Sequence, residues 1–227
     1  MPNRRFALLL SLLLGMVATG ACGLGAPTGE PPSEPETVTT DPAASGIEAI
    51  EITYFTSAQQ EGPYYLVDKP ADHDNDLVDF TRAAGVSAGE VFVLAGVIYN
   101  ANGLPVEGAV VEIWQTDHNG IYLHPDDPGT DQRDPNFQFF GESLIGADGV
   151  YSFRTILPGL YEPRPRHIHT KIRLDGKEVL TTQFNFGIEV SFSGVEANLV
   201  IEIAPAEDDL GDPIWVGERD IILNIDR

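Results

Sequence analysis

Short runs in which apolar and polar side chains alternate constrain this chain more than any other feature. Pairs typical of turns, such as Asn102-Gly103 and Asp148-Gly149, separate these runs. No stretch has the 3.6-residue periodicity of a helix longer than three turns. The sequence therefore predicts an all-β domain, an antiparallel β-sandwich with few or no long helices. Its expected strands are Val91–Tyr99, Ala109–Gln115, Val150–Ile156, His167–Leu174, Ala197–Ile203 and Arg219–Ile225.

The N-terminus has the pattern of an export signal. Arg4 and Arg5 precede an apolar run from Phe6 to Ala18, which is too short for a good membrane span, and small residues come before Cys22. We expect residues 1–21 to be a signal peptide and the protein to be exported. A cysteine directly after small residues is typical of a bacterial lipoprotein, anchored to the membrane by lipid on Cys22. The alternative is a plainly secreted protein.

Composition divides the rest of the chain into a tether and a folded domain, and it limits which ligands and metals the protein can bind. Residues 22–48 are rich in Pro, Thr, Glu and Gly, so they predict a flexible tether, and residues 49–227 form the expected single folded domain. The 35 acidic residues outnumber the 13 basic ones, giving a net charge of -22 that disfavours nucleic-acid binding. Since Cys22 is the only cysteine, His, Tyr, Asp or Glu must hold any metal.

Two histidines share one face of an expected strand. Side chains alternate along a strand, so His167 and His169 point the same way, with Cα atoms roughly 6.5 Å apart. Ile168 and Ile172 point to the opposite face, where they can pack into the core. Both imidazoles can therefore converge on one ion, although such pairs also arise by chance on protein surfaces.

Two tyrosines can join this pair. Tyr122 follows the Asn119-Gly120 turn, and Tyr161 follows the Pro158-Gly159 turn just before the histidines. Each tyrosine would lie at a strand end, where side chains from separate strands meet. A phenolate is a hard ligand that favours a hard cation such as Fe(III). The alternative is that both are ordinary tyrosines between core and rim.

These residues stand in segments that resemble the intradiol ring-cleavage dioxygenases, non-haem ferric enzymes that split catechols between their hydroxyl-bearing carbons. The resemblance implies a small aromatic diol and O2 as substrates. It implies Fe(III) held by Tyr122, Tyr161, His167 and His169, with Arg164 and Gln183 flanking the substrate. The similar segments run from Glu61-Gly62-Pro63-Tyr64-Tyr65, through Val111-Glu112-Ile113-Trp114-Gln115 and the stretch from Tyr161 to His169, to Arg219-Asp220-Ile221-Ile222-Leu223.

The resemblance also implies roles and shows departures. Tyr161 would take a proton from the diol, and Arg164 would stabilise negative charge on the substrate. Only two residues separate Tyr161 from Arg164, where better-known members have a loop, so the site should be more open. Tyr65 and Trp114 could shape the substrate pocket. The remaining histidines, in polar loops, are expected to be solvated: His73, His118 and His124.

A different class of protein fits part of the pattern. Segments such as the one from Gly103 to Ala109 also occur in transthyretin-like β-modules, where they build only turns and a core. A surface-anchored binding module of this kind would have the same sandwich. It would not require Tyr122, Tyr161 and the two histidines to converge, so their arrangement separates the two hypotheses.

Overall fold

The computed structural model describes residues 48–66, 68–79, 83–187 and 195–227. The chain divides into two units, Met1–Ile47 and Glu48–Arg227, and the fold below is that of the second. The predicted signal peptide, Cys22 and the predicted tether up to residue 47 lie outside the described residues. In the described part, no helix has the length and apolar character needed to cross a membrane.

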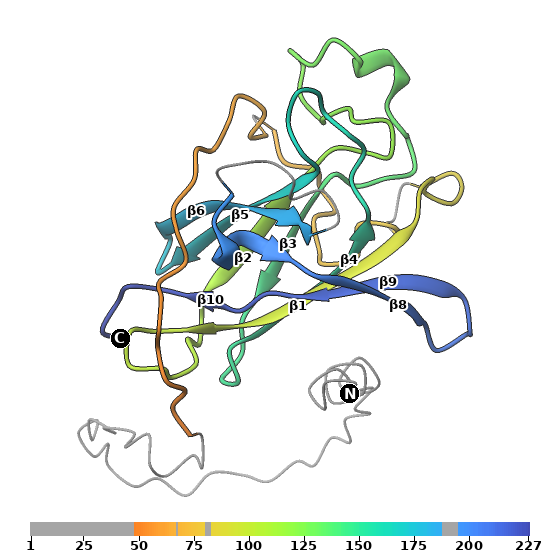
Figure 1. The fold of residues 1–227 in the computed structure, drawn as a ribbon. Helices are drawn as coiled ribbons and strands as arrows, with labels where there is room; N and C mark the ends of the chain where they lie inside the picture. Colours follow the sequence, from red (N-terminus) through yellow and green to blue (C-terminus); the bar gives the residue numbers. More distant parts are fainter. Residues whose placement is uncertain (1–47, 67, 80–82, 188–194) are drawn as a thin grey trace, which may run out of the picture. The chain divides into compact units, whose positions relative to one another are not determined.

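In the described residues, ten strands form two five-stranded sheets, which Figure 1 shows as two layers. The first sheet has the order β10-β1-β9-β8, with β4 also paired to β1, and the second has the order β3-β2-β5-β6-β7. Two short 3-10 turns, Thr130–Gln132 and Ala197–Leu199, lie among the described residues. The predicted all-β sandwich is thus confirmed. The strands are β1 (Val91–Tyr99), β2 (Val110–Trp114), β3 (Phe140–Leu144), β4 (Val150–Ile156), β5 (His167–Leu174), β6 (Lys177–Phe186), β7 (Val200–Ile201), β8 (Ile203–Glu207), β9 (Pro213–Glu218) and β10 (Ile221–Ile222).

Most strand pairs are antiparallel, as predicted, but both sheets are mixed. Strand β1 runs parallel to β9 and β10, and β6 runs parallel to β7. Side-chain alternation is the same in both kinds of pairing, so it does not reveal the direction of a neighbour. The expected strand at Ala197–Ile203 instead begins with a 3-10 turn, and most of Arg219–Ile225 lies outside β10. Strands β3, β6 and β9, and all of β8 beyond Ile203, were not predicted.

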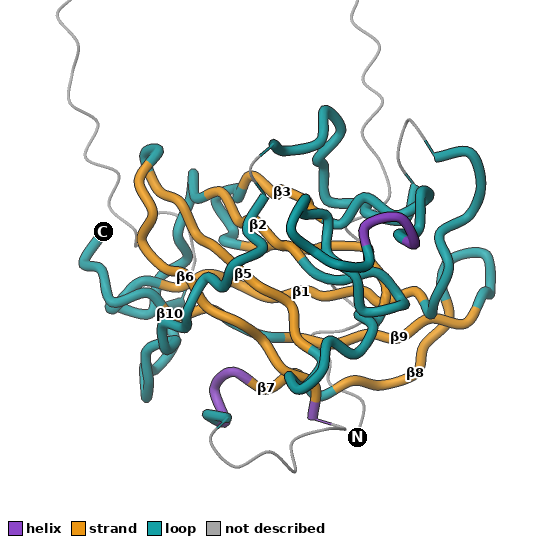
Figure 2. The backbone as a smooth tube through the Cα atoms, turned by 90° about the horizontal axis from the view of Figure 1, so that it is seen from above, coloured by secondary structure: helices purple, strands orange, loops and turns teal. Residues whose placement is uncertain are grey.

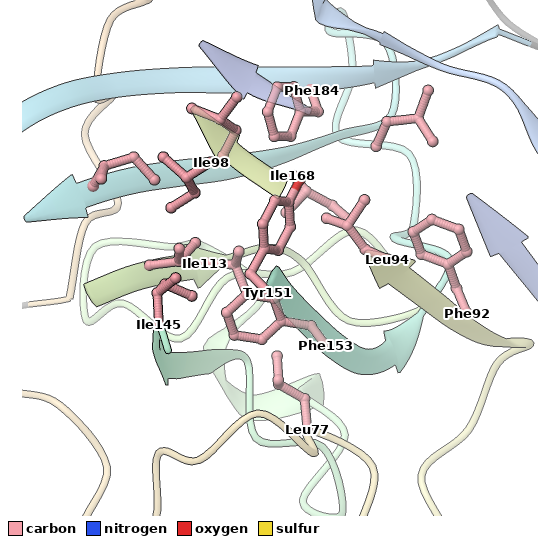
Figure 3. Packing of buried hydrophobic residues seen from close by; sticks show 14 of the residues in the cluster. Leu77, Phe92, Leu94, Ile98, Ile113, Ile145, Tyr151, Phe153, Ile168 and Phe184 are labelled. Carbon is pink, nitrogen blue, oxygen red and sulfur yellow. The ribbon is translucent and has the colours of Figure 1, made fainter. Parts of the chain in front are cut away.

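The core lies between the two sheets and sets which way β5 faces. Phe92 and Leu94 from β1 pack with Ile168 from β5, all without exposed surface (Figure 3). Ile172 from β5 belongs to the same buried cluster and is also without exposed surface. Burying side chains of this size contributes about 1.5–3 kcal/mol each. Because Ile168 and Ile172 occupy the core face of β5, the alternate residues His167 and His169 must face the other side of the sheet.

Candidate metal centre

Strand β5 places two histidines side by side on the face away from the core. His167 and His169 are buried, with 4% and 5% of their surface exposed. Their Nε2 atoms lie 3.1 Å apart. The prediction that alternation along this strand brings both imidazoles to one point is confirmed.

Two turns that contain glycine bring the loop that carries Tyr122 against the loop that carries Tyr161. The loops after β2 and β4 lie side by side (Figures 1 and 2), and the Gly159 amide donates a hydrogen bond of 2.7 Å to the Asp117 carbonyl. A Cβ on Gly120 would come within 2.2 Å of the Leu160 carbonyl oxygen, and one on Gly159 within 2.2 Å of the Gly120 nitrogen. Only glycines permit this approach. It sets the rings of Tyr122 and Tyr161 5.5 Å apart.

Three donor atoms form a nearly equilateral triangle. Tyr122 Oη lies 2.9 Å from His167 Nε2 and 3.1 Å from His169 Nε2. The third edge is the 3.1 Å between the two histidine Nε2 atoms. Bonds of about 2.0–2.1 Å to one metal at right angles put neighbouring ligand atoms about 3 Å apart. The spacing therefore suits a single ion. The described residues include no grouping of three or more His, Cys, Asp or Glu suited to a metal, so a centre here depends on tyrosine oxygen.

Burial and one hydrogen bond prepare the nitrogen atoms for a cation. His167 Nδ1 donates to the Pro165 carbonyl at 2.7 Å, which leaves the lone pair on Nε2 facing the triangle. Burial lowers the pKa of His167 to about 4 and the pKa of His169 well below its usual value, so both are neutral at pH 7. Burial also raises the pKa of Tyr122 above its usual value. A bound cation would instead lower the pKa of Tyr122, because its charge stabilises the phenolate, and the phenol would lose its proton.

Tyr161 lies beside the triangle, together with a tyrosine that the sequence analysis missed. The Tyr161 hydroxyl donates to the Tyr64 hydroxyl at 3.3 Å, and the Tyr64 ring lies 5.1 Å from that of Tyr122. The neighbouring Tyr161 hydroxyl, together with burial, raises the pKa of Tyr64 to about 12. The Tyr64-Tyr65 pair is visible in the sequence, but it lies in a turn, where no strand alternation predicts the side-chain directions. Nothing local shows which of them faces the site.

Arg164 and Gln183, which the resemblance places beside the substrate, meet next to the histidines in the structure. Arg164 Nη2 donates to Gln183 Oε1 at 2.6 Å, and Gln183 lies opposite His169 in the β5–β6 pairing. The Arg164 amide also donates to the Tyr161 carbonyl at 2.8 Å, so a tight turn joins the two residues. The guanidinium charge lowers the pKa values of both histidines further.

The two residues predicted to shape the substrate pocket lie behind the triangle. Trp114 has no exposed surface, and its ring stacks on His169 with centroids 4.7 Å apart. Tyr65 packs edge-on against Trp114 and donates its hydroxyl to Glu112 at 2.7 Å. Tyr64, rather than Tyr65, contacts the tyrosines of the site.

One loop histidine departs from its predicted environment. His124 was expected to be solvated, but it is only 7% exposed and its ring lies 5.4 Å from that of Tyr64. The turn after Tyr122 folds back on the site: the Asp126 amide donates to His124 Nδ1 at 3.2 Å and so holds the imidazole inward. The side chains of His73 and His118 remain 43% and 34% exposed.

Comparisons with known proteins place the whole site inside one family region. The family model Dioxygenase_C, described as Dioxygenase, matches residues 60–193, more than half of the chain. The chain is 34% identical over 134 residues to the protocatechuate 3,4-dioxygenase beta chain of Burkholderia cepacia, covering 55% of this chain and 57% of that one. It is 32% identical over 157 residues to catechol 1,2-dioxygenase of Acinetobacter baylyi, covering 60% and 48%. It spans about half the length of the curated relatives that it matches.

Solved structures agree with the sequence comparison. The dioxygenase domain of a dioxygenase carbohydrate-binding protein fusion from Streptomyces sp. SirexAA-E aligns with a TM-score of 0.60 at 30% identity, covering 76% of this chain and 99% of that one. Catechol 1,2-dioxygenase from Acinetobacter sp. ADP1 aligns with a TM-score of 0.59 at 26% identity, covering 80% and 65%. Together with the matched family region, these likenesses establish that the chain belongs to the intradiol ring-cleavage dioxygenase family.

Proposed function

We propose that this protein is a non-haem Fe(III) enzyme that cleaves catechol-type aromatic diols with O2 to cis,cis-muconate-type diacids. The observation that carries the proposal is the triangle of Tyr122 Oη and the two histidine Nε2 atoms, with edges of 2.9–3.1 Å. A sandwich that served only as a binding module would have no need to bury these three donors together. Relatives named for catechol and protocatechuate dioxygenase activities support a diol substrate without choosing between the two.

The donor set fits the proposed ion. Neutral imidazoles and phenol oxygens suit a hard trivalent cation, and Tyr161 beside the triangle would provide the fourth ligand after Tyr122, His167 and His169. When bound, Fe(III) would supply a Lewis acid and a template for the diol and O2. The predicted cofactor is therefore consistent with the side chains that the fold gathers.

The surrounding residues have distinct tasks in the proposed reaction. Tyr161 accepts a proton from the diol at its phenol oxygen, which the Tyr64 hydroxyl contacts at 3.3 Å. The Arg164 guanidinium stabilises negative charge that develops on the substrate. Gln183 orients this guanidinium through the 2.6 Å hydrogen bond from Arg164 Nη2 to Gln183 Oε1. Burial of the histidines keeps protons from competing for the ligand nitrogens.

The rim of the site supports the expected openness. Glu162, Pro163 and Arg164 are exposed, and Leu160 before them is 43% exposed. Only two residues lie between Tyr161 and Arg164, so this segment forms a short rim rather than a long loop over the site. We propose that the site admits diols with substituents as well as catechol itself.

Oxygen uptake by the iron-loaded protein tests the proposal. Catechol, protocatechuate and hydroxyquinol would each be added, with iron-free protein as the control, and the products would be identified by mass spectrometry. At least one diol should consume an equimolar amount of O2 and yield the diacid formed by cleavage between the hydroxylated carbons. An aldehyde product of cleavage outside the diol would contradict the proposal. Iron-loaded protein that consumes no O2 with any diol would instead support the transthyretin-like binding module.

A further inference from the structure

The two histidines of the triangle are held in different ways. His167 has its second ring nitrogen fixed by the Pro165 carbonyl at 2.7 Å. His169 Nδ1 is buried and has no hydrogen-bond partner among the described residues. Metal-binding histidines usually owe their orientation to a partner on that second nitrogen. Something other than a hydrogen bond must therefore set the ring plane of His169.

Trp114 provides a flat surface for this ring. The indole and the imidazole are nearly parallel, with an interplanar angle of 10° and centroids 4.7 Å apart. The pairing of β2 with β5 places the two residues directly opposite each other. Gly62 approaches the same imidazole, since a Cβ there would lie 3.3 Å from His169 Cε1. Stacking and close packing thus take the place of the missing hydrogen bond.

Trp114 is itself held by packing against Tyr65 and Lys171. The Tyr65 ring packs edge-on against it at 5.0 Å, and the Tyr65 hydroxyl donates to buried Glu112. Lys171 Nζ lies 3.7 Å from the centre of the Tyr65 ring and 5.8 Å from that of Trp114. The indole Nε1 is buried without a partner among the described residues, so packing rather than a hydrogen bond fixes the tryptophan as well.

We infer that Trp114 is a positioning residue: its indole fixes the ring plane of His169 and so aims Nε2 at the metal. The inference rests on the proposed function, because it requires that the triangle bind Fe(III). It replaces the expected place of Trp114 in the substrate pocket, which a side chain without exposed surface does not line. It also gives Tyr65 a part as the support of Trp114.

Three variants separate positioning from general packing. Trp114→Leu removes the flat ring, Trp114→Phe keeps a smaller one, and Phe140→Leu is the matched control. Phe140 is equally buried, lies opposite Trp114 in the β2–β3 pairing and belongs to the same apolar cluster with Tyr122. Fe(III) affinity would be measured by competition with a chelator, alongside the melting temperature and the visible absorption of each iron-loaded variant.

Trp114→Leu should weaken Fe(III) binding by about 10–100-fold, the usual loss when the support of a metal ligand is removed. Trp114→Phe should recover part of this affinity, and Phe140→Leu should keep wild-type affinity despite a lower melting temperature. Equal affinities in Trp114→Leu and wild type would overturn the inference and leave the proposed function standing. So would equal losses in Trp114→Leu and Phe140→Leu. Wild-type protein that binds no iron would overturn both.

Discussion

Tyr161→Phe is expected to lower kcat for diol cleavage on the order of 10²–10⁴-fold, the range that a positioned proton acceptor contributes. The change removes the phenol oxygen and keeps the ring, which packs edge-on against Tyr64 at 5.7 Å and against Tyr122 at 5.5 Å. The fold should therefore persist. Oxygen uptake at saturating diol would measure the rate, and the melting temperature would report the fold.

The control for this variant is Tyr54→Phe. Tyr54 is 37% exposed, and neither the structure nor the resemblance gives it a part in the site. The control should cleave diols at the wild-type rate. If iron-loaded Tyr161→Phe also kept that rate, Tyr161 would have no part in proton transfer and the assignment of its role would be wrong.

His167→Ala is expected to weaken Fe(III) binding by at least about 100-fold, because losing even an outer partner of a ligand costs 10–100-fold. Alanine removes one corner of the triangle and leaves Tyr122 Oη and His169 Nε2 without the third donor atom. Chelator competition and the iron content of the purified protein would measure the loss. Circular dichroism would show whether the sandwich remains folded.

His118→Ala provides the comparison for the loss of an imidazole. His118 is a partly exposed loop residue, with Nδ1 4.0 Å from an Asp134 carboxylate oxygen and outside the triangle. This variant should bind iron as the wild type does. Equal iron binding by His167→Ala and His118→Ala would show that the metal, if any, lies elsewhere.

Strand positions were predictable where a local pattern alone decides them. The bounds of β1, β4 and β5 agree with the alternation read from the sequence, since each strand has one face in the core. Strand β3 contains Gly141 and has three partly exposed or exposed residues at its end, so its pattern is weak. The parallel partners of β1 are brought in by distant segments, and no local signal encodes that pairing.

In the site, too, some residues could be placed from local sequence patterns and others only from the packing of the folded chain. Alternation put His167 and His169 on one face, and the two glycine turns marked where Tyr122 and Tyr161 would stand. The inward position of His124 and the stacking of Trp114 on His169 depend on how loops and sheets pack together. These placements therefore emerged only from the three-dimensional structure.

The central claim is that Tyr122, Tyr161, His167 and His169 hold one ferric ion, and visible absorption of the iron-loaded protein tests it most directly. A phenolate bound to Fe(III) gives a charge-transfer band, so protein titrated with iron in the absence of diol should turn red to burgundy. The band should grow until one equivalent has been added and should be absent from His167→Ala. Protein that stays colourless with a full equivalent of bound Fe(III), or that binds no iron, would contradict the account.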